Sequence, residues 1–307
     1  MRGTRLEATV ADDEAGERLD RWLAATFDEL SRRAARRLLE RGAVWVDGQR
    51  IRVASRAVKA GQDIVVVLEA PPKKVFTLDE ARVLFEDEWL LAVDKPAGVP
   101  AQATPGDAQS TVRAAAERYL RGHGEDASVH LPHRLDRGTS GVQLLAKGPQ
   151  AAHALGEIFR ERAVEKVYEA LSSGHWRGAD KEIVVEDRLE KQGRTVVSVF
   201  DGGRRAETAV RLVNQLAAGC HLEARPRTGR QHQVRVHLAD LGLPILGDRL
   251  YGPRPEPGAP RAPRMMLHAR SLAFAHPFKK SALEIESPLP DDFAASLEGL
   301  GASGSSL

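Results

Sequence analysis

Two consecutive prolines, Pro71-Pro72, divide the chain into two segments of different character. Proline lacks a backbone N–H and has a fixed φ angle, so a pair ends the preceding strand and extends the backbone. The segment before the pair is rich in arginine, whereas the longer segment after it mixes strand-like and helix-like patterns. A chain of 307 residues is also long for one small core. We therefore predict two domains joined by residues 71–74.

The first segment predicts a small module of helices and strands. Leu19, Trp22 and Leu23 have helical apolar spacing. A second helix is expected from an N-cap at Ser31 to a glycine stop at Gly42. An Asp-Gly hairpin turn at residues 47–48 and a closing strand at residues 61–68 follow. Residues 1–15 are expected to form a loose acidic lead-in.

The predicted second helix carries a basic outer face. Leu30, Ala34, Leu38 and Leu39 are expected to face the core. The opposite side then carries arginines at positions 32, 33, 36, 37 and 41. Arginines this close repel one another unless an anion compensates. A solvated charged helix is the simpler interpretation, but the pattern favours RNA binding.

In the second segment, the sequence His-Arg-Leu-Asp-Arg-Gly-Thr-Ser-Gly at residues 133–141 surrounds an acid with cations. The neighbouring guanidinium groups are expected to keep Asp136 ionised, as a carboxylate nucleophile requires. An isolated turn of this composition is more often a surface ion pair. The strand-like residues 142–147 that follow place Asp136 at a strand terminus.

A second basic stretch runs from Arg225 to Gly242. Thr228 and Gln231 have capping-box spacing, which predicts a helix beginning at Gly229. Val234, Leu238 and Leu241 would form its buried stripe. Arg235 would then lie one to two turns inside the helix, able to reach a buried carboxylate. The following residues 243–252 read as a loop rich in glycine and proline.

Other stretches complete a mixed α+β pattern. Residues 90–95 form an apolar strand that ends at Lys95-Pro96, residues 149–160 an amphipathic helix, and residues 164–170 a strand that contains Tyr168. Strict alternation of strand and helix is missing, which favours a largely antiparallel sheet with flanking helices. The glycine- and serine-rich end, residues 299–307, is expected to fray.

The sequence argues against several functional classes. There is no long apolar run, the first residues lack the apolar core expected of a signal peptide, and one cysteine, Cys220, fits a reducing cytoplasm. His232 and His237 are five residues apart, which does not suit a zinc pair on one helix face. No phosphate- or dinucleotide-binding glycine pattern is present. We therefore expect a cytoplasmic protein without metal, nucleotide cofactor or membrane anchor. The net charge of +2 does not identify a partner.

The two signature stretches carry a resemblance to a known family. HRLDRGTSG and TGRQHQVRVHLADLGLPILGD resemble the RluA-type pseudouridine synthases, and the likeness extends from Val83 to Phe293. ERLDRWL, SRRAARRLLERGAVWVDG and GQDIVV in the first segment resemble an S4 RNA-binding domain. Gln102 departs from the family, which often carries histidine there. The resemblance implies an N-terminal tail at 1–15, an S4 domain at 16–72, a synthase domain at 73–293 and a flexible tail at 294–307.

The resemblance also implies a function. The expected activity is isomerisation of specific uridines in structured RNA to pseudouridine, with large-subunit (23S) ribosomal RNA favoured and transfer RNA as the alternative. The protein is expected to need no cofactor and to act as a monomer. Two other hypotheses are a non-catalytic RNA-binding ribosome-assembly factor and a methyltransferase. Asp136 and Tyr168 argue against the first, and the missing cofactor loop argues against the second.

Residue roles follow from the same resemblance. Asp136 is the expected nucleophile, Arg235 its partner with Arg230 as second choice, and Tyr168 the ring that stacks on a flipped base. Arg134 is expected to fill the space that the base leaves. The expected RNA contacts in the synthase domain are His133, Arg134, Arg137, Thr139, Arg230, His232 and Gln233. Those in the S4 domain are Arg32, Arg33, Arg36 and Arg37.

Overall fold

The computed structural model describes residues 5–68, 75–103, 108–179, 181–252 and 262–302. The chain forms two compact units, one before and one after Phe76, and each is described by itself. The predicted linker at residues 71–74 lies outside the described residues. No helix in these ranges is long and apolar enough to cross a membrane.

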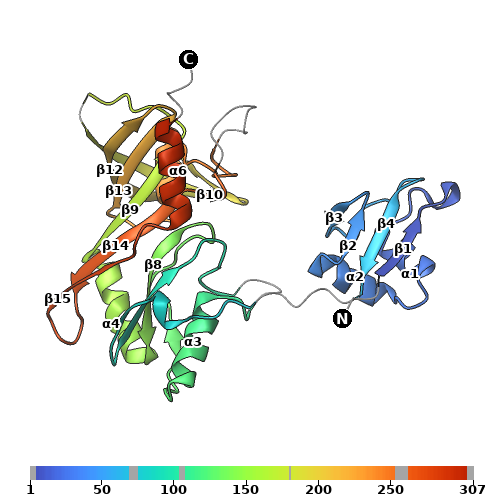
Figure 1. Ribbon diagram of the computed structural model, residues 1–307, viewed down its shortest axis with the longest axis horizontal. Coiled ribbons are helices and arrows are strands. Elements are labelled where there is room, and N and C mark those ends of the chain that lie inside the picture. The colour runs from blue at the N-terminus through green and yellow to red at the C-terminus, as the bar shows by residue number, and fades with distance from the viewer. Residues whose placement is uncertain (1–4, 69–74, 104–107, 180, 253–261, 303–307) are drawn as a thin grey trace. The chain divides into compact units, whose positions relative to one another are not determined.

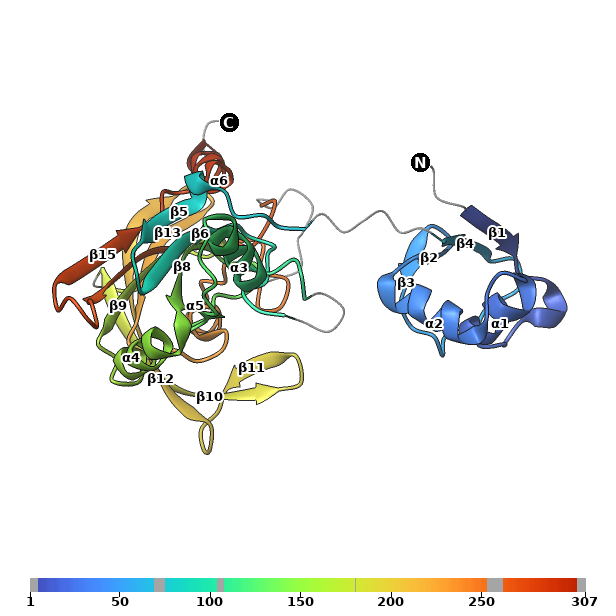
Figure 2. The same ribbon diagram turned by 90° about the horizontal axis from the view of Figure 1, so that it is seen from below.

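The first unit is a four-stranded antiparallel sheet in the order β1-β4-β2-β3, with two helices packed against one face (Figure 2). The elements are β1 (Arg5–Thr9), the 3₁₀ turn η1 (Asp12–Glu14), α1 (Leu19–Thr26), α2 (Arg32–Arg41), β2 (Val44–Val46), β3 (Gln49–Ile51) and β4 (Asp63–Val67). Trp22, Leu23 and Leu39 are buried between helices and sheet. The predicted helices, hairpin and closing strand are confirmed.

Local chemistry explains the ends of α2 and of the hairpin. The Ser31 hydroxyl accepts a hydrogen bond from the Ala34 N–H at 3.2 Å, so the predicted N-cap is confirmed. Gly42 ends the helix at φ 71°, in the left-handed region that glycine adopts without strain. Asp47 and Gly48 both have positive φ angles, which is the conformation of a tight hairpin turn.

The expected loose lead-in is wrong for residues 5–15. β1 pairs antiparallel with β4 along its whole length, from Arg5 opposite Val67 to Thr9 opposite Asp63. Leu6 and Ala8 pack against the core of this unit. Leu6 and Ala8 alternate with polar residues over only five positions, which is a weak strand pattern in the sequence. Pairing with β4, which is far away in the sequence, therefore stabilises this strand.

The second unit is a mixed sheet with flanking helices, which confirms the predicted α+β class (Figure 1). Eleven strands of the described residues form it, in the order β11-β10-β12-β13-β9-β14-β8-β6-β5, with β15 beside β14 and β7 beside β8. The strands are β5 (Val83–Glu86), β6 (Leu90–Lys95), β7 (Val129–His130), β8 (Ser140–Lys147), β9 (Val164–Ser172), β10 (Glu182–Gln192), β11 (Thr195–Ser198), β12 (Arg204–Leu216), β13 (Gly219–Pro226), β14 (Leu267–Ala275) and β15 (Ala282–Glu286).

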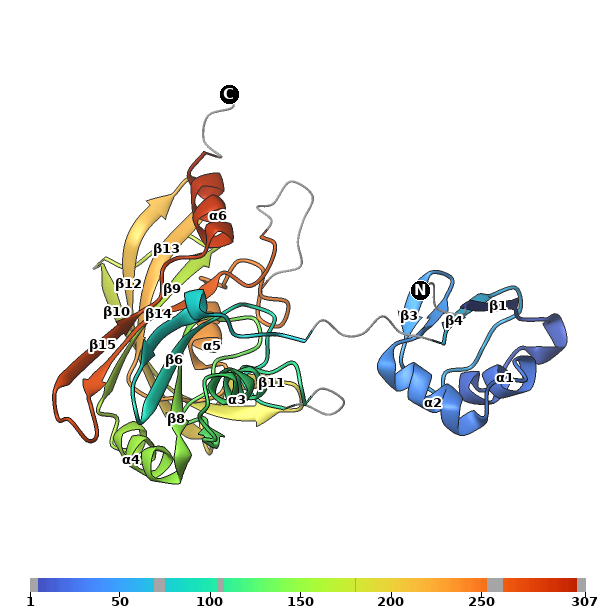
Figure 3. The ribbon, with the colours of Figure 1, turned by 60° about the horizontal axis from the view of Figure 1, so that its bottom comes forward.

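Helices cover this sheet at several points (Figure 3). They are η2 (Glu80–Arg82), α3 (Val112–Gly122), α4 (Gly148–Arg160), α5 (Gln233–Asp240) and α6 (Asp291–Ala302). Ala151 and Leu155 of α4 pack on one cluster with β6 and β8, while Val112 and Leu120 of α3 pack on another. Pro149 lies in the first turn of α4, as predicted.

One strand pair, β8 and β14, is parallel within a sheet that is otherwise antiparallel. Gly141 lies at this contact, with φ 109°. A Cβ atom on Gly141 would lie 2.1 Å from the Ala269 carbonyl oxygen. Only glycine therefore permits this approach, and it fixes the turn before β8 against β14.

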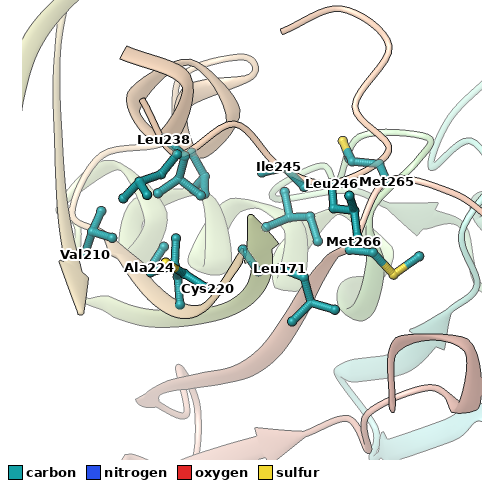
Figure 4. Close-up of a cluster of buried hydrophobic side chains, with 14 of the residues drawn as sticks. Leu171, Val210, Cys220, Ala224, Leu238, Ile245, Leu246, Met265 and Met266 are labelled. Carbon is teal, nitrogen blue, oxygen red and sulfur yellow. The ribbon is translucent and has the colours of Figure 1, made fainter. Parts of the chain in front are cut away.

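The largest core cluster packs α5 against the sheet (Figure 4). Leu238 of α5 lies among Val210, Cys220 and Ala224 from β12 and β13. Ile245 and its neighbours in the loop after α5 join the same cluster. This packing holds both α5 and the loop that follows it.

The structure corrects the predicted start of α5. The helix begins at Gln233 rather than Gly229, and His232 before it is left-handed, with φ 55°. The Thr228 hydroxyl does not cap a helix, because it donates to the Gln233 side-chain oxygen at 2.7 Å and accepts from the Glu207 N–H at 2.9 Å. Arg235 consequently lies in the first turn of the helix rather than one to two turns inside.

The predicted flexible tail at 294–307 is wrong for residues 294–302, which belong to α6. Phe293 and Leu300 are buried in the largest core cluster, and the Leu300 carbonyl accepts from the Ala218 N–H. Apolar spacing along this face outweighs the low helix propensity of its glycines. Residues 303–307 lie outside the described residues.

Candidate active site

Asp136 lies in the turn that leads into β8. The Leu135 N–H donates to the Gln143 side-chain oxygen at 3.1 Å, and the Thr139 N–H donates to the Asp136 carbonyl oxygen at 3.1 Å. Leu135 is buried, which anchors the turn, while the Asp136 side chain keeps 26% of its surface exposed. The carboxylate is therefore held by a fixed backbone but can still meet a ligand.

Arg235 reaches this carboxylate from α5. Its Nη1 atom lies 2.8 Å from Asp136 Oδ2, which is the contact expected from the sequence. Its Nε and Nη2 atoms contact Asp248 at 2.7 and 2.8 Å. Burial lowers the pKa of Arg235, but the two carboxylates outweigh this and raise it. Such a fork of hydrogen bonds fixes the orientation of the guanidinium group.

Asp248 is a functional candidate that the sequence analysis passed over. Its side chain is 1% exposed and also accepts a hydrogen bond from the Leu250 N–H at 2.9 Å. Gly247 before it permits a close approach, because a Cβ atom there would lie 2.0 Å from the Arg264 carbonyl oxygen. In the sequence, the only sign of this role was a single acid, Asp248, that follows a glycine in a largely apolar loop.

Tyr168 lies on β9, close enough to Asp136 for the carboxylate to affect the pKa of the Tyr168 hydroxyl. Burial raises the pKa of the Tyr168 hydroxyl, and the Asp136 carboxylate raises it further. The Tyr168 phenol on β9 is therefore neutral. The strand position matches the prediction, whereas the stacking role stays a prediction.

His232 and Tyr251 form the other side of the site. His232 Nδ1 lies 2.7 Å from the Tyr251 hydroxyl, and His232 Nε2 lies 3.9 Å from Asp136 Oδ2. The Tyr251 hydroxyl accepts from the Val196 N–H at 2.7 Å, so its own proton is free to be donated to Nδ1. The Nε2–H bond of a neutral His232 then faces Asp136. Tyr251 was not predicted.

The Tyr251 ring also lies below a cation. The Arg235 guanidinium carbon is 4.9 Å from the ring centroid, within the range of a cation–π contact. Burial lowers the pKa of His232, while Asp136 partly opposes this. Tyr251 thus contacts both groups that approach Asp136 Oδ2.

Lys95 is a further unpredicted residue beside the Asp136 turn, where its Nζ atom lies 3.4 Å from the Arg137 carbonyl oxygen. Its buried ammonium group donates to the carbonyl oxygens of Pro96 and Val99 at 3.1 and 2.9 Å. Burial lowers its pKa to about 7, and the Asp136 charge opposes this. The sequence had marked Lys95 only as the end of a strand.

Arg137 joins the Asp136 turn to the loop after Lys95. Its Nε atom donates to the Gly98 carbonyl oxygen at 2.7 Å, and the Gly98 N–H donates to the Arg137 carbonyl oxygen at 2.7 Å. The guanidinium group is exposed apart from this contact. Its predicted contact with RNA stays a prediction.

Three predicted RNA contacts point inward. His133 Nε2 accepts from the Leu144 N–H at 2.9 Å, and its ring stacks on Phe159. Burial, with a smaller effect of Lys166, lowers the pKa of His133 to about 3, so the ring is neutral and cannot attract phosphate by charge. Gln233 and Thr139 are buried, and the Gln233 amide bonds within the protein.

The remaining predicted residues lie apart from the carboxylate. Arg230 Nε donates to the Arg205 carbonyl oxygen at 2.9 Å, and no contact with Asp136 occurs among the described residues. Arg235, rather than Arg230, is therefore the observed partner. Arg134 is exposed, which is compatible with its predicted contact with RNA.

The two oxygens of Asp136 have different surroundings. Oδ2 contacts Arg235 and lies near His232. Within the described ranges, Oδ1 has no hydrogen-bond partner. One oxygen is thus held while the other can react with an electrophile.

In the first unit, the basic face of α2 is organised by a buried acid, Asp20. Arg18 Nε contacts Oδ1 at 3.0 Å, while Arg32 and Arg36 contact Oδ2 through Nε at 3.1 and 2.7 Å. All three use Nε, so their outer Nη groups keep donors for another ligand. Arg33 and Arg37 are exposed, as predicted.

Two family models match the chain. One is described as RNA pseudouridylate synthase and matches residues 89–240. The other is the S4 domain, which matches residues 17–64. The first range contains Asp136, Tyr168 and Arg235, and the second contains the arginine-rich α2.

Similar proteins were found across bacteria. Ribosomal large subunit pseudouridine synthase C of Vibrio cholerae is 33% identical over 91% of this chain and 92% of its own length. Ribosomal large subunit pseudouridine synthase D of Nitrosomonas europaea is 33% identical over 96% of this chain and 88% of its own length. The solved structure of human RNA pseudouridylate synthase domain containing 4 is 28% identical, with a TM-score of 0.57, over 72% of this chain and 93% of that one.

Proposed function

This chain belongs to the RNA pseudouridylate synthase family and carries an N-terminal S4 domain, and we propose that it converts specific uridines of large-subunit ribosomal RNA to pseudouridine. Two similar bacterial proteins are named for the large ribosomal subunit, which supports this RNA over transfer RNA. A ribosomal RNA substrate would place the enzyme in the cytoplasm.

One observation carries the proposed chemistry: Arg235 Nη1 holds Asp136 Oδ2 at 2.8 Å, and Oδ1 lacks a hydrogen-bond partner in the described residues. This contact orients the carboxylate, because Asp248 holds Arg235 from the other side. Asp136 is thus prepared to act on an electron-poor carbon of the substrate.

The reaction rearranges bonds within one nucleotide. The N1–C1′ bond of uridine breaks, the uracil turns, and C5 bonds to C1′. The proton on C5 is lost and N1 gains one, so atoms balance without a cofactor. Asp136 acts at the ribose during bond cleavage. Its charge stabilises the electron-poor sugar, or its oxygen bonds to it.

The target base must leave its stack in the RNA, which costs a few kcal/mol. Tyr168 offers an aromatic face on which the uracil can stack. Its raised pKa keeps the phenol protonated at neutral pH, which supports packing rather than removal of the C5 proton. The exposed Arg134 is suited to stack in the space that the base leaves.

The substitution Asp136→Asn tests the catalytic assignment. The amide keeps the size of the side chain but removes its charge, so we expect no detectable pseudouridine and little change in unfolding temperature. Asp126→Asn is the matched control, because Asp126 is exposed. Formation of pseudouridine by the Asp136→Asn enzyme at the wild-type rate would refute the role of Asp136.

The substrate is tested by mapping pseudouridines in cells that lack this protein. We expect specific sites in large-subunit ribosomal RNA to disappear, and to return with the wild-type gene but not with the Asp136→Asn gene. Loss confined to transfer RNA would overturn the proposed substrate. An unchanged map together with a ribosome-assembly defect would favour a non-catalytic RNA-binding factor.

A further inference from the structure

Four cationic side chains from three segments lie close enough for their charges to interact: Arg162 from the turn before β9, Lys166 from β9, Arg204 from β12, and Arg230 from the loop before α5. Two hydrogen bonds join these segments. Lys166 Nζ donates to the Thr228 carbonyl oxygen at 3.1 Å, and Arg230 Nε donates to the Arg205 carbonyl oxygen at 2.9 Å. We call these four residues the cation cluster.

The cation cluster differs from its neighbours because it is not neutralised. In the described part of the chain, none of its members forms an ion pair with a carboxylate, and both hydrogen bonds above end on neutral carbonyl groups. Two adjacent arginines, Arg205 and Arg227, instead pair with Glu207. The cluster therefore concentrates positive charge without an internal counterion.

Burial and, to a smaller extent, mutual repulsion disfavour the charged forms of two members of the cation cluster. Burial lowers the pKa of Lys166 to about 8, and Arg162 contributes to the shift. Burial also lowers the pKa of Arg230, with contributions from Arg204 and Arg162. A half-buried cation that lacks a counterion is unfavourable, and a bound anion would relieve it.

The cation cluster lies next to the residues proposed to hold the target nucleotide. Side chains of a strand alternate between its two faces, so Lys166 and Tyr168 project to the same side of β9. The charge of Lys166 also contributes to the low pKa of His133, three residues before Asp136. An anion on the cluster would thus border a uridine placed against Tyr168.

We propose that the cation cluster is a binding site for a backbone phosphate of the RNA substrate, adjacent to the target uridine. The site rests on the proposed function, which supplies the RNA. Lys166 provides a compact ammonium group, while the arginines provide planar donors suited to phosphate oxygens. A phosphate fixed here would hold the backbone while the uracil turns.

The test measures the affinity of the full-length enzyme for an unmodified transcript of large-subunit ribosomal RNA at several KCl concentrations. Lys166→Met removes the charge and keeps most of the stem, Lys166→Arg keeps the charge, and Arg204→Gln changes an exposed member of the cluster. Arg205→Gln and Arg227→Gln are the matched controls, because each removes a neighbouring charge that is already paired.

Each lost phosphate contact lowers the slope of log affinity against log salt by roughly 0.7 to 0.9. We expect this loss for Lys166→Met and Arg204→Gln, near wild-type slopes for Lys166→Arg and both controls, and a KM that rises by more than kcat falls. Equal slopes in all variants would overturn the proposal, as would equal losses in the controls. If Lys166→Met does not fold, Arg204→Gln decides alone.

The salt dependence of binding and the formation of pseudouridine are separate measurements, so the two proposals can fail independently. An enzyme that binds the transcript with the predicted slopes but forms no pseudouridine would contradict the proposed function and leave the phosphate site supported. If the wild-type enzyme forms pseudouridine but Lys166→Met and Arg204→Gln keep the wild-type slope, the proposed function is supported and the phosphate site is contradicted.

Discussion

Single residues set the charge balance around Asp136. Arg235 is shared between two carboxylates, one buried and one partly exposed. If Arg235 were removed, Asp248 would be left as a buried charge without its main partner, at a cost of several kcal/mol. The arginine is therefore needed for folding as well as for the orientation of Asp136, so a loss of activity on its removal has two causes.

Tyr251 allows a cleaner test at this scale. Tyr251→Phe keeps the ring below Arg235 but removes the hydroxyl that bonds to His232 and accepts from the Val196 N–H. His232 then loses the group that fixes its Nε2–H tautomer, and the donor near Asp136 is no longer ensured. We expect kcat to fall by about tenfold, the effect of about one hydrogen bond, with KM unchanged.

Nitrogen NMR of the His232 ring separates positioning from general loss of structure. The wild-type ring should show a protonated Nε2, and Tyr251→Phe should show a mixture of tautomers. A pure Nε2–H tautomer in the variant would contradict this role. Tyr119→Phe is a suitable control, because Tyr119 lies on α3 and its ring contacts His123.

The sequence analysis predicted a contact in the site when both of its residues lay in the two stretches that resemble the family, HRLDRGTSG and TGRQHQVRVHLADLGLPILGD. Asp136 and Arg235 each lie in such a stretch, and their contact was expected. Asp248, Tyr251 and Lys95 were missed because a loop acid, a tyrosine and a lysine are common in other roles. Only the folded chain shows that Asp248 contacts Arg235, that Tyr251 contacts His232, and that the Asp136 charge acts on Lys95.

Among the elements, α2 depends on its link to α1 through Asp20. Burial raises the pKa of this carboxyl, but three guanidinium groups outweigh burial and hold the pKa well below its ordinary value. The stability that comes from this depressed pKa is present above the unfolded pKa, about 4, and is lost as the pH falls below it.

We therefore expect Asp20→Asn to destabilise the first unit at neutral pH, by on the order of 2 kcal/mol because its partners are half-exposed. The difference from wild type should shrink as the pH drops below about 4. Denaturant unfolding followed by tryptophan fluorescence, to which Trp22 and Trp45 of this unit contribute, measures it, with exposed Asp28→Asn as the control. A difference that stays constant down to strongly acidic pH would contradict the linkage.

A second test at this scale concerns the parallel contact of β8 and β14. Gly141→Ala would place a methyl group against the Ala269 carbonyl oxygen and strain a positive φ angle. We expect a loss on the order of 3 kcal/mol, together with lower activity, because the Asp136 turn precedes β8 directly.

Gly156→Ala is the matched control for that substitution. Gly156 lies inside α4, and a Cβ atom there would meet nothing within 4 Å. Alanine should raise stability by roughly 0.5 to 1 kcal/mol. Thermal unfolding of both variants measures the two effects, and a Gly141→Ala protein as stable as wild type would show that the strands can separate without cost.

Elements were predicted well where their ends have local signals. Ser31 and Gly42 bound α2 as expected, because both ends are fixed by nearby hydrogen bonds. The start of α5 was misplaced, because Thr228 bonds to Glu207 on another strand. β1 was missed for a similar reason, since its partner β4 lies beyond both helices in the sequence.

At the scale of the whole molecule, the S4 domain and the proposed catalytic residues belong to different units. The S4 domain carries the arginines around Asp20, whereas Asp136, Tyr168 and Arg235 all belong to the second unit. The predicted boundaries at residues 16–72 and 73–293 stay a prediction, since the linker lies outside the described residues.

Removal of residues 1–72 should weaken binding to large-subunit ribosomal RNA and lower its salt dependence, because phosphate contacts are lost. Turnover at saturating RNA should persist, since the contacts of Asp136 lie in the remaining chain. Filter binding at several salt concentrations and single-turnover assays measure the two effects. Equal affinity with and without residues 1–72 would remove the assigned role of the S4 domain.

The parallel pairing of β8 with β14 has a consequence for synthesis of the protein. His268 of β14 pairs with Ser140 of β8, so β8, which follows the Asp136 turn, can complete its pairing only after β14 has been translated. Arg235 is also made long after Asp136. A nascent chain that has emerged as far as α4 holds the signature turn without either support. The full set of contacts that hold the Asp136 turn should thus form only after β14 has been synthesised.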